Sequence, residues 1–200
     1  IRVNYLQGGS ESSLTAEKLI LATGAYDRSL PFPGWDQPGS MTPGAAQALL
    51  KGHGVLAGQS VVVAGTGPFL LPVATGLAEA GANVIGLYEA HSPMRWLLSP
   101  QALLLNVSKF AELIYYAGLI RKHRITPRFG RVVSRFDKGQ VTITSVSSSF
   151  ALKKNKSQTF DADVVAVGWG FSPDLTLGGI LGCKERVDVD GTTIFDVDAD

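Results

Sequence analysis

The sequence has 200 residues but a single cysteine, Cys183. One cysteine forms neither an internal disulfide nor a Cys-x-x-Cys pair, so the chain carries no redox-active cysteine pair. We therefore expect a reducing compartment and a cytoplasmic location, with Cys183 as a small buried thiol. The histidines, His53, His91 and His123, stand apart from one another, so we predict no metal site and nominate no catalytic residue.

The chain also lacks a charge imbalance and long apolar runs. Lys and Arg number 18 against 17 Asp and Glu, which leaves a net charge of +1. Nothing in this balance points to a nucleic acid or an anionic membrane as a partner. No apolar run reaches about 18 residues, so no membrane span is expected. Hydrophobic residues make up 45% of the chain, which is enough for one sizeable core or two small ones.

An initiator methionine is missing as well, and both ends resemble cuts within a longer protein. The chain opens in a predicted strand, Ile1–Leu6, and closes on the acidic run Asp196–Asp200. Residues 16–22 are predicted to form a second strand that ends at Thr23-Gly24. The segment Leu30–Gly39 is too rich in Pro and Gly for regular structure, and we interpret it as a connection between domains.

The most informative stretch is Ser60-Val-Val-Val-Ala-Gly-Thr-Gly-Pro-Phe-Leu-Leu, residues 60–71. Its β-branched run is typical of a strand buried on both faces of a parallel sheet. Pro68 stands where the first helical residue is expected, because a missing N–H costs nothing there. Pro72 is expected to forfeit a backbone bond and distort the helix. The helix is predicted to reach about Ala80, and a second strand follows at Asn83–Tyr88.

This order of strand, glycine turn, helix and strand is how a dinucleotide-binding βαβ unit is built. Gly65 permits the tight turn, Gly67 lets phosphates approach the backbone, and the helix N-terminus supplies N–H donors. Glu89 lies 19 residues after the sixth fingerprint position (89 − 70 = 19), where an acidic residue bonds a ribose hydroxyl. It would repel a 2′-phosphate, so NAD is favoured over NADP. The predicted dinucleotide contacts are Gly65, Thr66, Gly67, Pro68, Phe69 and Glu89.

The fingerprint is incomplete at its sixth position. Leu70 stands where Gly or Ala is usual, so close packing of helix on strand must come from elsewhere, such as Ala74. His91 and Arg95 follow Glu89 closely, and we favour ordinary surface roles for both over a 2′-phosphate contact. The alternative to a nucleotide site is a βαβ unit that binds nothing, with Glu89 as a solvated strand end.

Further elements are predicted on both sides of this unit. One short helix is expected from Pro43 to about Lys51, and a longer one from Leu97 to about Lys122. The cations at Arg121–Arg124 complement the dipole of the longer helix, which we favour over phosphate binding. From Pro127 the hydrophobic period changes to two. Strands are predicted at residues 131–136, 140–146, 157–160 and 163–167.

Two apolar strands ending in glycine turns, residues 19–28 and 164–174, bracket the βαβ unit. With this arrangement the chain resembles the flavoproteins with two dinucleotide-binding domains, the pyridine nucleotide-disulfide oxidoreductase-like family. Residues 28–35, 41–51 and 65–74 are most similar to the FAD-binding subunits of opine oxidases, hydroxyproline dehydrogenases and hydrogen cyanide synthase. The alpha subunit of sarcosine oxidase is a more distant likeness.

The resemblance implies an α/β fold. A Rossmann-like NAD(P)-binding domain, with a parallel sheet, helices and an antiparallel β-meander, would be flanked by partial FAD-domain strands. Residues 1–40 would end the first half of the FAD domain, 41–160 would form the NAD(P)-binding domain, and 161–200 would return into the FAD domain. In the full protein, three strand-end residues would line the FAD side: Thr23, Gly24 and Gly168.

The function that the resemblance implies is that of an FAD-dependent oxidoreductase, in which this segment supports hydride transfer between nicotinamide and flavin. The expected cofactors are NAD, with NADP less favoured, and FAD in the full-length protein. Partner oxidase subunits of an amino-acid-, opine- or amine-oxidising complex are expected, and so is an oligomer. The alternative is a non-catalytic scaffold with a vestigial nucleotide site, which Leu70 and Pro72 favour and Glu89 opposes.

Overall fold

A computed structural model describes residues 1–92 and 107–197, with side chains described except for residues 107–113 and Lys154. The chain divides into two compact units. Unit 1 comprises Ile1–Tyr26 and Ser172–Asp200, and unit 2 comprises Asp27–Phe171.

Unit 2 is built on a parallel sheet. In the described residues its strand order is β4-β11-β5-β6-β7, and every neighbouring pair is parallel. The strands are β4 (Ser40–Met41), β11 (Val164–Gly168), β5 (Ser60–Gly65), β6 (Asn83–Glu89) and β7 (Pro127–Phe129). The central strands β5 and β11 are almost entirely buried. The strands predicted from the apolar runs near residues 60 and 163 are therefore confirmed, and both lie at the centre of one sheet.

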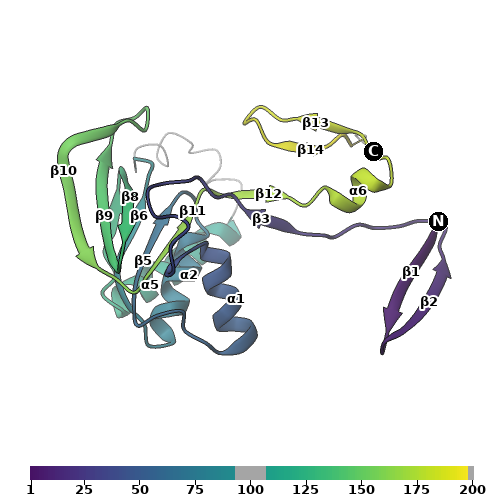
Figure 1. The fold of residues 1–200 in the computed structure, drawn as a ribbon, viewed down its shortest axis with the longest axis horizontal. Coiled ribbons are helices and arrows are strands. Elements are labelled where there is room, and N and C mark those ends of the chain that lie inside the picture. Colours follow the sequence, from purple (N-terminus) through teal and green to yellow (C-terminus); the bar gives the residue numbers. More distant parts are fainter. Residues whose placement is uncertain (93–106, 198–200) are drawn as a thin grey trace. The chain divides into compact units, whose positions relative to one another are not determined.

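Side chains of β5 alternate between two hydrophobic cores. Val61 and Val63 pack with the helix side of the sheet, in a cluster that includes Val73 and Leu77. Val62 and Ala64 pack on the other face, against the antiparallel strands. The described residues of unit 2 include the helices α1 (Pro43–His53), α2 (Leu70–Glu79) and α5 (Val107–Lys122) (Figure 1). This alternation explains why the run is continuously apolar, because both faces of the strand are covered.

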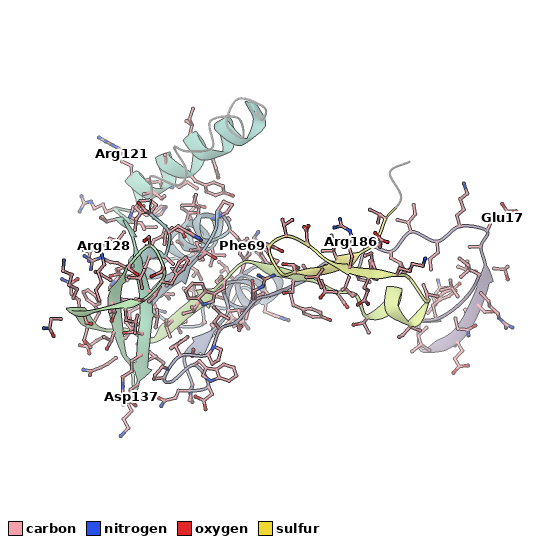
Figure 2. The ribbon with its side chains drawn as sticks, turned by 90° about the horizontal axis from the view of Figure 1, so that it is seen from above. Glu17, Phe69, Arg121, Arg128, Asp137 and Arg186 are labelled. Atoms are coloured by element: carbon pink, nitrogen blue, oxygen red, sulfur yellow. The ribbon has the colours of Figure 1, made fainter. Side chains whose placement is uncertain are left out.

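The second layer of unit 2 is an antiparallel meander in the order β10-β9-β8. Its strands are β8 (Arg131–Asp137), β9 (Gln140–Val146) and β10 (Leu152–Asp161). Asp137 lies where β8 turns into β9 (Figure 2), and its carboxylate pairs with Arg135 at 3.0 Å. The predicted period-two strands are confirmed, with β10 starting earlier than expected.

The helix of the βαβ unit begins later than predicted. Helix α2 begins at Leu70 with Phe69 as its N-cap, so Pro68 lies in the preceding turn and not at the first helical position. Pro72 is consequently the third residue of α2. The first four N–H groups of a helix have no partner within it, so Pro72 forfeits no backbone bond. The expected distortion at Pro72 was wrong because the helix starts two residues later than predicted.

The long helix predicted at Leu97–Lys122 is confirmed for Val107–Lys122, and residues 97–106 lie outside the described part of the chain. Its last turn carries Arg121 and Lys122 (Figure 2). Cations at this end stabilise the helix dipole, as the sequence indicated. None of the helices in the described residues is long and apolar enough to cross a membrane.

Unit 1 consists of small ribbons. Strands β1 (Arg2–Gln7) and β2 (Ser10–Thr15) form a hairpin, and β13 (Glu185–Val187) pairs with β14 (Thr193–Phe195). A helix of five residues, α6 (Thr176–Ile180), precedes β13. Strand β3 (Ala25–Asp27) pairs with β12 (Phe171–Pro173).

Two predictions for unit 1 were wrong. Residues 16–22 do not form a strand, and Ile20 is 91% exposed. Apolar sequence alone does not make a strand, because its N–H and C=O groups need a paired neighbour, and no strand among the described residues pairs with this segment. Cys183 is exposed and not buried.

The domain boundary predicted at residue 161 stays a prediction, and β11 belongs to unit 2. β11 pairs with β5 along its whole length, and the chain leaves unit 2 only after Phe171. The start of β11 is tied to the start of β5 by Asp163, whose Oδ2 accepts the N–H groups of Gln59 at 2.9 Å and Ser60 at 2.8 Å. Hydrogen bonds from Ser60 and then Gln59 lower the pKa of the Asp163 carboxyl.

This tie gives unit 2 a pH-dependent contribution to stability. Because the pKa of Asp163 is lowered by folding, its carboxylate stabilises the fold above the ordinary aspartate pKa of about 3.9, and the contribution is lost as the pH falls below it. Asp163→Asn should therefore lower the melting temperature at pH 7, and its difference from the unchanged protein should shrink below about pH 4. Asp161→Asn is the matched control. A deficit of Asp163→Asn that stays constant with pH would contradict this assignment.

Candidate functional site

The carboxyl ends of β5, β6 and β11 meet at Gly65. The Thr66 N–H donates to the Gly168 carbonyl at 2.9 Å, and the Ala90 N–H donates to the Gly65 carbonyl at 2.8 Å. Gly65 has φ +134°, and a Cβ there would overlap the Gly168 carbonyl oxygen. The tight turn predicted for Gly65 is thus required twice, by the backbone conformation and by the strand beside it.

Gly67 is a glycine for a different reason. Its φ is +98°, and a Cβ placed on it would meet no atom within 4 Å. The backbone at Gly67 therefore faces open space, which is what the close approach of a ligand to the turn requires.

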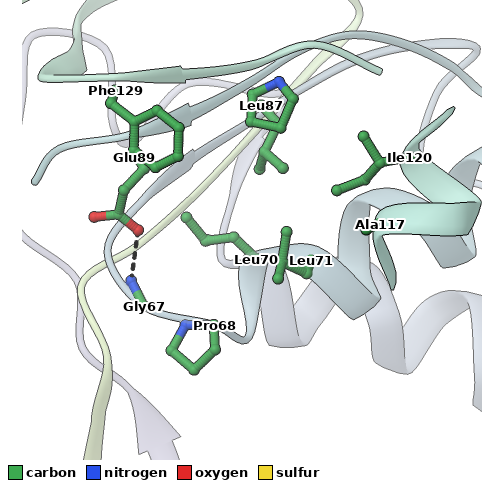
Figure 3. A pocket seen from close by; sticks show the side chains of 10 residues that line it. Gly67, Pro68, Leu70, Leu71, Leu87, Glu89, Ala117, Ile120 and Phe129 are labelled. Carbon is green, nitrogen blue, oxygen red and sulfur yellow. Dashed lines mark hydrogen bonds between the residues drawn. The ribbon is translucent and has the colours of Figure 1, made fainter. Parts of the chain in front are cut away.

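Glu89 ends β6 and turns its carboxylate back onto this turn. Its Oε2 accepts the Gly67 N–H at 2.9 Å (Figure 3), and its Oε1 accepts the His91 N–H at 3.0 Å. The His91 ring contacts the same Oε1 through Nδ1 at 3.1 Å. Glu89 is only 6% exposed, so it is not a solvated strand end. The sequence suggested that His91 is isolated, but the structure makes it part of the hydrogen-bond network of the turn.

The N–H groups around the turn are largely used within the chain. Thr66 bonds Gly168 and Gly67 bonds Glu89, while Pro68 has no N–H. The first two helical N–H groups, of Leu70 and Leu71, reach back to the carbonyls of Gly67 at 3.3 Å and Pro68 at 3.1 Å. Phe69 is the residue of this turn to which the described part of the chain gives no acceptor. The turn thus offers fewer donors to a pyrophosphate than its sequence predicted.

An apolar cavity of ≈ 300 Å³ lies beside Glu89 (Figure 3). It is enclosed by the ends of β6 and β7 and by α2 and α5. Its lining residues are Gly67, Pro68, Leu70, Leu71, Leu87, Glu89, Ala117, Ile120, Pro127 and Phe129. Among the described residues of this lining, Glu89 is the one that carries a charge. Sequence reasoning missed the cavity because its walls come from four separate segments, and no local pattern marks them.

On the other side of the turn, Phe69 packs against Phe171. Their ring centroids lie 4.9 Å apart with an interplanar angle of 67°, an edge-to-face contact. Phe69, labelled in Figure 2, was predicted as a cofactor contact. Its ring packs on Phe171, and its role toward a cofactor stays a prediction.

Of the three residues predicted to line an FAD site, Thr23 and Gly24 precede β3 in unit 1, and Gly168 ends β11 in unit 2. In unit 1, Thr23 donates its hydroxyl to the Asp174 carbonyl at 2.9 Å, and the Gly24 carbonyl accepts the Asp174 N–H at 3.0 Å. In unit 2, Gly168 accepts the Thr66 N–H, and a Cβ on it would lie 2.8 Å from the Pro43 ring. A role of these residues toward FAD stays a prediction.

The fold and the turn define a class of protein. A parallel sheet with a central strand, a Gly-x-Gly turn, a helix and an acidic residue at the end of the next strand is a Rossmann-type fold. The sequence matches the pyridine nucleotide-disulphide oxidoreductase family over residues 1–196, and the chain belongs to that family. The resemblance inferred from the flanking glycine turns is therefore confirmed.

Curated relatives match most of the chain. The HcnB subunit of hydrogen cyanide synthase from Pseudomonas protegens is 36% identical over 88% of this chain and 38% of the relative. An opine oxidase subunit from Rhizobium meliloti is 43% identical, and the match covers 92% of this chain and 34% of the relative. The alpha subunit of sarcosine oxidase from Corynebacterium sp. (strain P-1) is 30% identical, and the match covers 86% of this chain and 17% of the relative. The chain thus spans 17% to 38% of the length of these relatives.

Solved structures show the same fold at lower identity. The 6-hydroxypseudooxynicotine amine oxidase HisD of Pseudomonas geniculata N1 aligns with a TM-score of 0.60 at 22% identity, covering 83% of this chain and 23% of that one. A NAD-dependent persulfide reductase from A. fulgidus aligns with a TM-score of 0.53 at 18% identity, covering 98% and 38%.

The two glycines of the turn should respond differently to alanine. Gly65→Ala forces a methyl group into the Gly168 carbonyl, and we expect a loss of more than about 4 kcal/mol or no folded protein. Gly67→Ala meets open space and bears only backbone strain, about 1–2 kcal/mol. Thermal and urea unfolding of both variants measures the difference. Equal losses at the two positions would show that the Gly65–Gly168 contact is not what constrains the turn.

Proposed function

We propose that this chain is the NAD-binding segment of an FAD-dependent oxidoreductase, with the adenosine end of the dinucleotide at Glu89 and in the neighbouring cavity. The observation that carries the proposal is the placement of one buried carboxylate between the Gly67 backbone and an apolar cavity. A nucleoside needs both features together, because its ribose is a hydrogen-bond donor and its base is flat and poorly solvated.

The size of the cavity supports a base and not a whole dinucleotide. Ligand pockets range from about 300 to 1,000 Å³, and the cavity beside Glu89 measures ≈ 300 Å³. The rest of the ligand would run out of the cavity along the open side of Gly67. The N-terminus of α2 points its dipole at that path, which favours the negative charge of a pyrophosphate.

The lining of the cavity determines how a base would be held. Leu71, Ile120 and Phe129 offer apolar surface from three different elements. Burial of about 100 Å² of base surface contributes about 2.5 kcal/mol. The base would therefore be bound by contact with these side chains, while the ribose hydroxyls give the directional hydrogen bonds at Glu89.

Glu89 also favours NAD over NADP. A phosphate on the ribose would stand close to its carboxylate, and like charges about 4 Å apart repel by about 4 kcal/mol near a protein surface. Glu89 and the Gly67 turn would hold the dinucleotide, which would supply hydride chemistry toward the flavin of the full protein, while the chain supplies position and surroundings.

The relatives support a place in a larger flavoprotein. They are subunits of a hydrogen cyanide synthase, an opine oxidase and a sarcosine oxidase, so we propose that this chain belongs to an amine- or amino-acid-oxidising complex with partner subunits. Unit 1, with Thr23 and Gly24, would form part of its FAD domain. The exposure of Leu6, Ile20 and Ile180 fits ribbons that further structure covers. A cytoplasmic location and an oligomeric state stay predictions.

A second candidate is a scaffold domain whose nucleotide site is vestigial. It is favoured by the donors that the turn has lost: Pro68 has none, and the N–H groups of Thr66 and Gly67 are bonded within the chain. A domain of this kind would keep the fold and the interface of the family without binding a nicotinamide dinucleotide.

Titration calorimetry with NADH separates the two candidates. If the proposed function is right, NADH binds and NADPH binds more weakly. Glu89→Ala should lower the affinity for NADH by about tenfold or more, which is the usual contribution of a hydrogen bond to a charged group. Ala117→Phe should also weaken NADH, because Ala117 lines the cavity from the exposed side of α5.

Ile114→Phe is the matched control for the cavity. Ile114 is exposed on the same helix and does not line the cavity, so the variant should bind NADH unchanged. If the folded protein binds no nicotinamide dinucleotide, the scaffold is supported. If NADH binds and neither Glu89→Ala nor Ala117→Phe affects it, the ligand lies elsewhere.

A further inference from the structure

His91 lies against the carboxylate at the centre of the proposed site. Its backbone N–H and its ring Nδ1 both reach Glu89 Oε1, at 3.0 and 3.1 Å. The imidazole ring also makes an edge-to-face contact with the Phe150 ring. The ring centroids lie 5.2 Å apart and the ring planes meet at 87°. Two independent contacts therefore fix the imidazole beside Glu89.

The contact defines which histidine nitrogen carries a proton. A carboxylate oxygen accepts hydrogen bonds and donates none. The 3.1 Å contact from His91 Nδ1 to Glu89 Oε1 is therefore a hydrogen bond only when Nδ1 is protonated, which assigns that tautomer or the imidazolium.

The hydrogen bonds leave the carboxylate little spare capacity. Its two oxygens accept about four hydrogen bonds in all. Oε1 already accepts two, from the backbone and the ring of His91, and Oε2 accepts one from Gly67. Among the bonds that the described residues make, this leaves one acceptor position, and it is on Oε2. A ribose diol that used both oxygens of the carboxylate would have to displace the His91 ring.

We infer that His91 is a specificity-determining residue that limits Glu89 to one ribose hydroxyl. The inference rests on the proposed function, since it concerns how the same site reads the adenosine ribose. His91 acts through Glu89 and is a positioning residue. Removal of its ring donor returns a second acceptor position, on Oε1, to the ligand.

The experiment is titration calorimetry of the purified protein with NADH and with its 2′-deoxy- and 3′-deoxyadenosine analogues. One analogue should bind about tenfold more weakly than NADH, because it lacks the hydroxyl that reaches Oε2. The other should bind within about twofold of NADH, because its missing hydroxyl has no acceptor on the carboxylate.

Variants of His91 test the cause of this asymmetry. His91→Phe keeps a ring against Phe150 and loses the Nδ1 donor, so the tolerated analogue should now bind about tenfold more weakly than NADH to that variant. His91→Asn keeps a side-chain N–H near Oε1 and should restore the original pattern. His53→Phe, on the exposed end of α1, is the control and should change nothing.

The outcomes separate this inference from the proposed function. If NADH does not bind, both are overturned. If NADH binds and Glu89→Ala weakens it, but the two deoxy analogues lose affinity equally, the site exists and reads the diol with both oxygens, and the inference about His91 is wrong. It is equally wrong if His91→Phe keeps the original asymmetry.

Discussion

The backbone contact between Gly65 and Gly168 is the constraint on which the site depends. It brings the end of β5 so close to β11 that Gly65 tolerates no side chain, and the Thr66 N–H closes the turn onto the Gly168 carbonyl. Ala90 then attaches the end of β6 to Gly65. Three parallel strands therefore end at one point, and the turn and Glu89 are placed by the sheet and not by loops.

Burial of the Glu89 carboxylate follows from this closure. A buried charge is tolerated only when hydrogen bonds replace its water, and here the donors are the Gly67 N–H and two groups of His91. The same bonds that make the carboxylate stable also restrict what it offers to a ligand. A carboxylate at this strand end is thus both a structural link between β6 and the turn and the group that selects the nucleotide in our proposal.

The parts of this site that the sequence predicted are those that follow from local chemistry. A β-branched run buried on both faces, a turn that needs glycine and an acidic residue at the next strand end are readable along the chain, and β5, Gly65 and Glu89 were placed correctly. Pro68 misled the prediction because a proline fits a preceding turn as well as a helix start. The cavity depends on residues that only folding brings together, which no local pattern reveals. Residues 16–22 form no strand because no described strand pairs with them, and an apolar sequence does not supply that neighbour.

The central claim is that the adenosine of NAD lies between Glu89 and the apolar cavity, and a crystal structure of the protein with NADH tests it most directly. The account predicts a ribose hydroxyl within hydrogen-bonding distance of Glu89 Oε2 and the base against Leu71 and Phe129. It also predicts that the Glu89 contacts to Gly67 and His91 are retained. Adenosine bound outside this cavity, or a Glu89 side chain turned away from the ribose, would contradict it.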